Sequence, residues 1–227
     1  MTRRLRIHWK IRSVLAFVLD SGMFAYDFSS SPSYFSTFDL QPSKSIDISV
    51  FRLLPDRMRL SLEFARGIGE TRPELGKFYI RGDWRKKAEF IELPEPGTPI
   101  KLLVRGDGKE VVYETLPAGS YTNSTIGREL VPFVDDGNPI RIPWPPKLSA
   151  SPMLASGYSN FNVSILEVGQ QLTAEKVTVV IHPPITLKSV EPNYVFLSWF
   201  ILWPIFANLL VGYGGILLWK SKSSVAK

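Results

Sequence analysis

The sequence contains no cysteine, and this absence excludes several kinds of site at once. Its 227 residues include no cysteine and two histidines, His8 and His182. Without thiols there can be no disulfide, no thiolate nucleophile, no iron–sulfur cluster and no cysteine zinc site. The two histidines lie far apart in sequence, which disfavours a histidine metal site. We therefore expect no metal and no cofactor.

Motifs for nucleophilic or phosphate chemistry are also missing. The chain has no G-x-S-x-G elbow and no glycine-rich loop ending in Lys-Ser or Lys-Thr. Asp135 and Asp136 stand in an Asp-Asp-Gly-Asn segment, where side chains usually serve a turn. His182 precedes two prolines, and we expect no serine, cysteine or metal partner beside it. These observations predict a protein that is not an enzyme.

The net charge of +6 does not predict nucleic-acid binding, because basic residues gather at the two ends of the chain. They flank apolar segments, where basic residues set membrane orientation and contact anionic headgroups. The basic residues of the ends are Arg3, Arg4, Arg6, Lys10, Arg12, Lys220, Lys222 and Lys227. We expect membrane lipid, and not nucleic acid, as a partner.

Residues Tyr194–Trp219 contain no Asp, Glu, Lys or Arg. At about 1.5 Å per helical residue, the run is long enough to cross a hydrocarbon core of roughly 30 Å. Aromatic residues lie near both ends, and lysines follow directly. This pattern predicts a transmembrane helix with a cytoplasmic C-terminus.

The N-terminal segment leaves two interpretations open. A basic arm precedes the apolar residues Val14–Phe28, which suits either a signal peptide or a retained first membrane helix. Met23 occupies the outer small-residue position of the cleavage pattern before Ala25, which disfavours cleavage. Asp20 disfavours a helix, because a carboxylate near mid-bilayer costs about 2.5–3.5 kcal/mol on insertion scales. We favour the retained anchor, and both interpretations predict a cytoplasmic start.

The middle of the chain alternates apolar and polar residues at the period of half-buried strands. Residues 46–50 and 58–64 are predicted to pair as a hairpin across Pro55-Asp56, and 100–104 and 111–116 across Gly106-Asp107-Gly108. Further strands are expected at 157–168, 177–181 and 185–187, and a short helix within 123–133. Seven or eight strands of this kind predict a mainly β, antiparallel, immunoglobulin-like β-sandwich.

The predicted organisation therefore has five parts. These are a basic cytoplasmic arm (1–12), a membrane anchor or signal segment (13–28), an extracytoplasmic β-sandwich domain (29–191), a transmembrane helix (194–219) and a cytoplasmic basic tail (220–227).

Two sets of residues are candidates for contacts. Tryptophan and arginine are enriched at interface hot spots, which favours two loops as protein-binding sites. Their residues are Arg81, Trp84, Arg85, Lys86, Trp144 and Lys147. Within the apolar run, Gly212, Gly214, Gly215 and Asn208 are predicted to pack against a neighbouring helix.

The middle of the chain resembles the small extracytoplasmic β-sandwich immunity proteins that accompany type VI secretion effectors, particularly lipases and phospholipases. The resemblance lies in Phe38-Asp39-Leu40 leading into Ile46–Val50, in Met58–Phe64, in Gly97–Leu102 and in Gly157–Leu166. It implies a stoichiometric inhibitor that binds a secreted toxin in the periplasm and covers its active-site cleft.

We therefore expect an inner-membrane protein with a periplasmic binding domain that neutralises a toxic effector. Two other functions remain open: a scaffolding subunit of an envelope complex, and an enzyme or sensor acting on lipid or glycan. For the last of these, His182, Asp135 and Asp136 are the candidate residues.

Overall fold

The structure, a computed structural model, describes residues 3–30, 34–78, 90–106, 108–133, 141–143, 151–186 and 190–223. Two compact units emerge. One, here the helical unit, combines Met1–Ser31 with Pro184–Lys227. The other, the β domain, comprises Pro32–Pro183.

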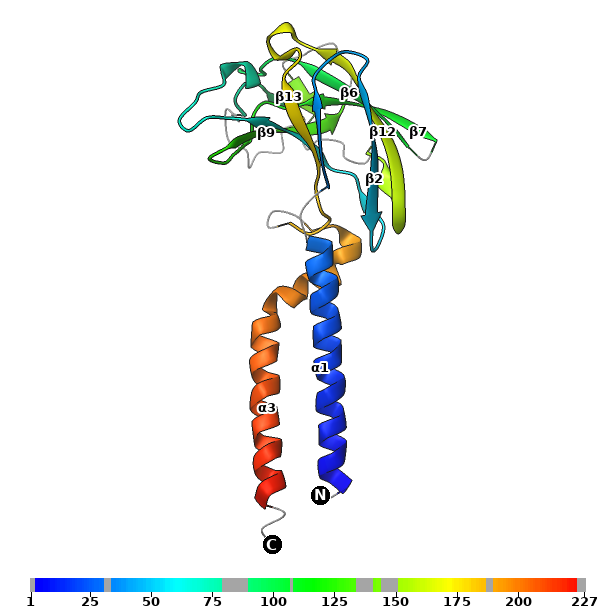
Figure 1. Ribbon diagram of the computed structural model, residues 1–227, viewed down its shortest axis with the longest axis vertical. Helices are drawn as coiled ribbons and strands as arrows, with labels where there is room; N and C mark the ends of the chain where they lie inside the picture. The colour runs from blue at the N-terminus through cyan, green and yellow to red at the C-terminus, as the bar shows by residue number, and fades with distance from the viewer. Residues whose placement is uncertain are drawn as a thin grey trace. The chain divides into compact units, whose positions relative to one another are not determined.

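The helical unit contains two long helical segments (Figure 1). Helix α1 spans Arg3–Ser30 without interruption. The second segment begins with the 3₁₀ turn η4 (Pro192–Tyr194) and continues through α2 (Val195–Ser198), η5 (Trp199–Leu202) and α3 (Trp203–Ser223). The 3₁₀ turn η5 ends at Leu202, two positions before Pro204, whose ring and missing N–H disturb regular α-helical bonding.

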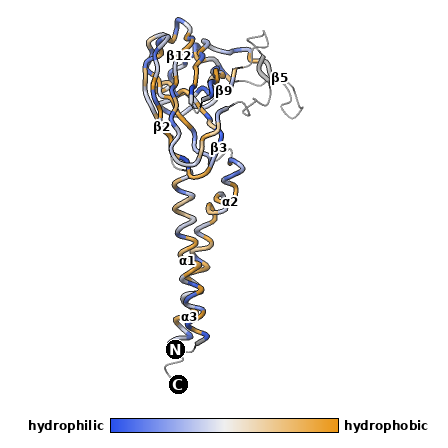
Figure 2. The backbone as a smooth tube through the Cα atoms, turned by 90° about the vertical axis from the view of Figure 1, so that its right-hand side faces the viewer, coloured by the Kyte–Doolittle hydropathy of each residue, from blue (hydrophilic) through white to orange (hydrophobic). Residues whose placement is uncertain are grey.

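Residues Pro192–Ser223 form a helical segment that is long and apolar enough to cross a membrane. No acidic or basic side chain interrupts it from Pro192 to Trp219. Most of its large apolar side chains are exposed, including Trp199, Leu209 and Val211. Figure 2 shows hydrophobic residues along most of the paired helices and hydrophilic ones toward the chain ends. Among the described helices, this segment alone meets the length and composition required of a span.

Helices α1 and α3 pack side by side and run in opposite directions (Figure 1). Gly22 of α1 lies beneath the ring of Phe200, and the Arg12 guanidinium lies on Gly214. Further along the same contact, Leu5 and Leu217 are both buried. Less exposed residues recur every three or four positions along α1, which is the spacing of a helix–helix seam. Those residues are Leu5, Trp9, Arg12, Ala16, Leu19, Met23 and Tyr26.

The β domain is built mainly from one antiparallel sheet of nine strands. Its order is β1-β13-β4-β9-β7-β6-β12-β2, with β8 paired to β9. The bounds are β1 Tyr34–Asp39, β2 Ser45–Arg52, β4 Leu60–Ala65, β6 Ile100–Gly106, β7 Lys109–Thr115, β8 Ser120–Tyr121, β9 Thr125–Pro132, β12 Gly157–Val168 and β13 Lys176–Ile181. Two short ribbons pair β10 (Arg141–Pro143) with β5 (Phe90–Glu92), and β11 (Met153–Leu154) with β3 (Asp56–Arg57). The 3₁₀ turns η1 (Pro73–Leu75) and η3 (Gln170–Leu172) complete the described elements of this domain.

This sheet curls until its two edge strands, β1 and β2, come into contact. No ladder joins them among the described residues, so the sheet is barrel-like and nearly closed. Its interior holds one apolar cluster contributed by every part of the sheet, including Ile48, Phe64, Val104, Phe161 and Val179. Tyr34 at the start of β1 pairs with Ile181 at the end of β13, so the chain enters and leaves the domain at the same end.

The prediction of a mainly β, antiparallel domain is confirmed. The predicted arrangement was a sandwich of two sheets, whereas the structure has one main sheet that curls into a nearly closed barrel. The 100–104 and 111–116 hairpin is confirmed as β6–β7. The predicted pairing of 46–50 with 58–64 is wrong: β2 pairs with β12, and β4 lies between β13 and β9. The linker between β2 and β4 carries β3, which pairs with β11. Because this linker pairs with another segment, it does not form the tight turn that a hairpin of β2 and β4 requires.

Two further predictions are corrected. The short helix expected within 123–133 is wrong, because Thr125–Pro132 form β9. Its buried residues Ile126, Arg128 and Leu130 alternate at the strand period, and both neighbouring strands pair with it. Of the strand expected at 185–187, Ile185 makes an isolated bridge with Val190, and Leu187 lies outside the described residues.

Candidate binding face on strands β2 and β12

All six residues predicted to bind a protein partner lie outside the described residues. Arg81, Trp84, Arg85 and Lys86 fall within 79–89, and Trp144 and Lys147 within 144–150. Asp135 and Asp136 also lie outside them. These residues stay predictions, and the described strands offer a different candidate surface.

The three glycines of α3 differ in whether they contact α1. A side chain at Gly214 would place its Cβ 2.7 Å from Arg12 Nε, so this glycine permits the close approach of α1. Nothing lies within 4 Å of the equivalent positions on Gly212 and Gly215. Asn208 Nδ2 donates to the carbonyl oxygen of Pro204 at 2.9 Å. Among the four predicted packing residues, Gly214 is thus the one at the α1 contact.

The side chains along the outer face of β2 and β12 form a regular polar strip. The antiparallel register pairs Ser45 with Ser164, Asp47 with Asn162, Ser49 with Asn160, and Phe51 with Tyr158. The residues between them, such as Ile48 and Phe161, face the core and are buried. The alternation that fills the core therefore also places these eight side chains on the outside. We call them the β2–β12 face.

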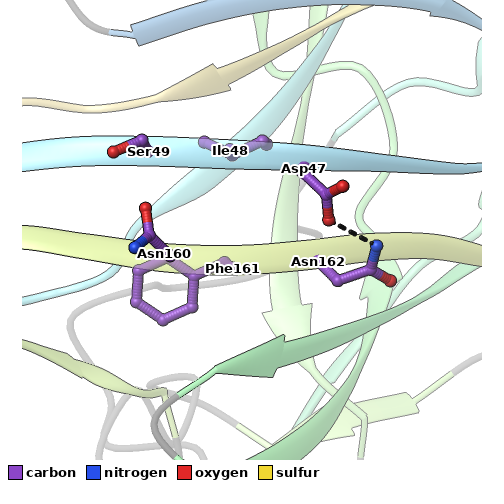
Figure 3. A pocket seen from close by; sticks show the side chains of 6 residues that line it. All are labelled: Asp47, Ile48, Ser49, Asn160, Phe161 and Asn162. Atoms are coloured by element: carbon purple, nitrogen blue, oxygen red, sulfur yellow. Dashed lines mark hydrogen bonds between the residues drawn. The ribbon is translucent and has the colours of Figure 1, made fainter.

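A hollow of about 360 Å³ lies where the middles of β2 and β12 pair. It is lined by Asp47, Ile48, Ser49, Asn160, Phe161 and Asn162. Figure 3 shows the amide of Asn162 directed at Asp47, where Nδ2 donates to Oδ1 at 2.8 Å. The hydrogen bond fixes two of the polar groups relative to each other. The hydroxyl of Ser49 and the amide of Asn160 add both donors and acceptors.

Two exposed aromatic rings close one end of the β2–β12 face. The rings of Phe51 and Tyr158 lie 5.2 Å apart, edge to face, with 66° between their planes. Tyr158 is 75% exposed and Phe51 is 38% exposed, so the pair forms an aromatic patch on the surface. The edge-to-face contact holds Tyr158 in place while leaving most of its surface available.

His182 does have a serine neighbour, contrary to the prediction. Its Nε2 lies 2.9 Å from Oγ of Ser61, because β13 and β4 are adjacent strands. Burial, together with the positive charge of Arg59, lowers the pKa of His182. Ser61 itself is buried, and no carboxylate hydrogen-bonds to the imidazole among the described residues. This geometry favours a structural pair over a nucleophile and its base.

Buried arginines form the polar interior of the β domain. Arg52 and Asp56 make a buried ion pair at 3.1 Å, and Arg52 also donates to the carbonyl oxygen of His182 at 2.8 Å. Arg128 is 1% exposed and donates to the carbonyl oxygens of Leu116 and Thr98, each at 2.7 Å. Burial lowers the pKa of Arg128 to about 10, so it stays charged at neutral pH. The sequence carried one signal for this interior, because Arg128 stands in register with the buried Ile126 and Leu130, and the predictions from the sequence did not use that signal.

The described residues contain no group of three or more side chains suited to hold a metal ion. No protein-family model matches the chain, and no curated protein matches it. Among solved structures, the chain is similar to a crystal structure of a protein from Sulfurospirillum deleyianum. The similarity has a TM-score of 0.39 and 16% identity, and covers 66% of this chain and 96% of the other. A similarity this distant carries no argument about function.

Proposed function

We propose that this protein is a membrane-anchored binding protein whose β domain recognises a protein partner outside the cytoplasm. The observation that carries the proposal is the β2–β12 face, a rigid surface combining an exposed aromatic pair with amide, hydroxyl and carboxylate groups. Tyrosine, serine and asparagine are enriched in the binding loops of antibodies, and the β2–β12 face carries the same residue types. Aromatic rings supply contact area at low entropic cost, and small polar side chains adapt their hydrogen bonds.

The proposed topology has both helices of the helical unit in the membrane. The segment Pro192–Ser223 is the apolar span, and α1 packs against it in the opposite direction. Basic residues gather at the N-terminal end of α1 and at Lys220 and Lys222, which favours a cytoplasmic location for both ends. The β domain, inserted between the two helices, would then lie in the periplasm.

The more specific form of the proposal is an immunity protein that neutralises a secreted, lipase-like effector, as the resemblance of the strands implies. A toxin that attacks phospholipid works at the membrane surface. An inhibitor tethered to that surface meets it at a raised effective concentration, without any additional contact.

A toxicity rescue tests this function. The effector gene nearest to this gene in the genome is expressed in the periplasm, with and without the full-length protein. We expect growth to be restored by the wild type, and restored less well by Tyr158→Ala. Tyr121→Ala is the matched control, because Tyr121 is also an exposed tyrosine (51%) but lies on β8. Equal rescue by both variants would contradict a role for the β2–β12 face.

The second candidate is a structural subunit of an envelope complex. The exposed surfaces of Gly212 and Gly215, which nothing in the described chain covers, favour it. Co-purification in mild detergent separates the two functions. One soluble secreted protein supports the immunity function, and a set of integral membrane proteins supports the structural one.

A further inference from the structure

Asp20 is an acidic side chain on the part of α1 that lies beside the apolar span. Along the antiparallel helix pair it falls between two contacts, that of Gly22 with Phe200 and that of Arg12 with Leu210. Both partners belong to the uncharged stretch of the second helical segment. Where that stretch crosses a membrane, Asp20 must lie within the hydrocarbon region as well.

Asp20 is exposed and stands at the flank of the contact with the second helical segment. The less exposed residues on either side of it, Leu19 and Met23, belong to the seam with α3, whereas Asp20 is exposed. On the same outward side stand Phe17 and Phe24, which are 72% and 74% exposed. Spacings of three, four and seven residues place Phe17, Asp20 and Phe24 along one face of the helix. We call these three residues the Asp20 face.

Within the described part of the chain, no side chain or backbone group forms a hydrogen bond or ion pair with Asp20. Ionisable groups inside a bilayer are costly, and they almost always face the interior of a helix bundle or a water-filled cavity and pair with other polar groups. Arg12 is the basic residue nearest to Asp20 in sequence. Its guanidinium packs on Gly214, and its Nε donates to the carbonyl oxygen of Leu210. Arg12 lies eight residues away, or about 12 Å along the helix.

We propose that the Asp20 face binds a transmembrane helix of another protein, which supplies a lysine or arginine to Asp20. Charge complementarity selects this partner, since a cation satisfies a carboxylate in a low-dielectric medium and a second carboxylate does not. A second copy of this chain would bring another Asp20, or the amide of Asn208. The contacts of Gly22 with Phe200 and of Arg12 with Leu210 put Asn208 level with about residue 14 of α1, and so at a different depth from Asp20. The proposal rests on the proposed membrane topology.

Photocrosslinking tests the proposal in the full-length protein, expressed in its own host. A photoreactive phenylalanine analogue replaces Phe24, and a matched variant carries it at Leu209, an outward residue of α3 that is 66% exposed. We expect an adduct from position 24 with an integral membrane protein, mapped to a helix that contains Lys or Arg. Asp20→Leu should lower its yield about fivefold or more, whereas Asp20→Glu should retain it. The Leu209 variant should not give this adduct.

Three results would overturn the proposal: an adduct of the chain with itself, adducts with lipid only, or a yield that Asp20→Leu leaves unchanged. The topology is tested separately, since the chain has no cysteine and each introduced one is unique. Arg4→Cys and Lys222→Cys should react with an impermeant maleimide only after lysis. Reaction in intact cells would contradict the topology itself, whereas protection with no adduct would contradict only the partner.

Discussion

The two units of this protein place polar and apolar side chains in opposite ways. In the β domain, apolar residues fill the interior, and the few charges inside are surrounded by hydrogen-bond acceptors. In the helical unit, large apolar side chains face outward, and polar groups such as Arg12, His8 and Tyr213 lie at the contact between helices. His8 Nδ1 and the Tyr213 hydroxyl are 2.8 Å apart. The apolar exterior belongs above all to Pro192–Ser223, the segment that is long and apolar enough to cross a membrane.

The arginines make the comparison concrete. Arg128 lies inside a curled sheet, where loops and strand ends supply several carbonyl oxygens that no strand uses. Arg12 lies on α1 and donates to the carbonyl oxygen of Leu210 on α3, where most carbonyls already accept bonds from their own helix. The interior of the β domain therefore offers Arg128 several carbonyl oxygens, whereas the Arg12 guanidinium donates to Leu210 across the helix contact.

The largest expected effect concerns the buried arginine of the β domain. Arg128→Met should lower the free energy of unfolding by about 3 kcal/mol or more, because several buried carbonyl oxygens lose their donor. The measurement is urea unfolding of the full-length protein in mild detergent, followed by circular dichroism. Arg105→Met is the control. Its ion pair with Glu110 is exposed and should contribute about 0–1 kcal/mol. Equal losses would contradict the distinction between interior and surface charges.

The next effect concerns the helix contact. Gly214→Leu should separate α3 from Arg12, whereas Gly212→Leu should not, because only the first position lies against α1. Disulfide formation between Leu5→Cys and Leu217→Cys measures the contact in a chain free of other thiols. We expect the yield of this disulfide to fall about fivefold or more in Gly214→Leu and to change little in Gly212→Leu. A loss in both variants would indicate that α3 itself is disturbed.

The smallest effect is a pH dependence of the β domain. Burial and the charge of Arg59 lower the pKa of His182 in the folded state below its unfolded value. The unfolded chain then binds more protons, so stability rises with pH between the lowered pKa and about 6.5. His182→Gln, which can still bond to Ser61, should flatten the unfolding free energy across this range. A slope that persists in His182→Gln would assign the dependence to other groups.

The alternation of apolar and polar residues predicts where several strands lie, but it does not predict which strand pairs with which. Alternation revealed β2, β12 and β13, because one buried face imposes a period of two. It did not reveal that β2 pairs with β12, since those residues are more than a hundred positions apart and the connecting segments give no local signal. The helix predicted at β9 failed because Ser124 and Thr125 mimic a helix cap, whereas pairing on both sides decided the outcome.

The same limit applies to the candidate site. Each residue of the β2–β12 face looks like an ordinary outward strand residue when read along the chain. The face exists only through the register, which brings Phe51 to Tyr158 and Asp47 to Asn162. By contrast, the sequence predicted helix packing at Gly212, Gly214 and Gly215 alike. The contact with Arg12 is what distinguishes Gly214 from the other two.

The pairing of the first strand of the β domain with the last has a mechanical consequence. Because Tyr34 stands opposite Ile181, a force that draws the two chain connections apart acts at one end of the β1–β13 ladder. The load would then fall on one hydrogen bond at a time, as in a zipper, and not on all of them together as in shear. Tension between the two connections should therefore peel β1 away at low force, and a rupture measurement on the tethered protein would detect this.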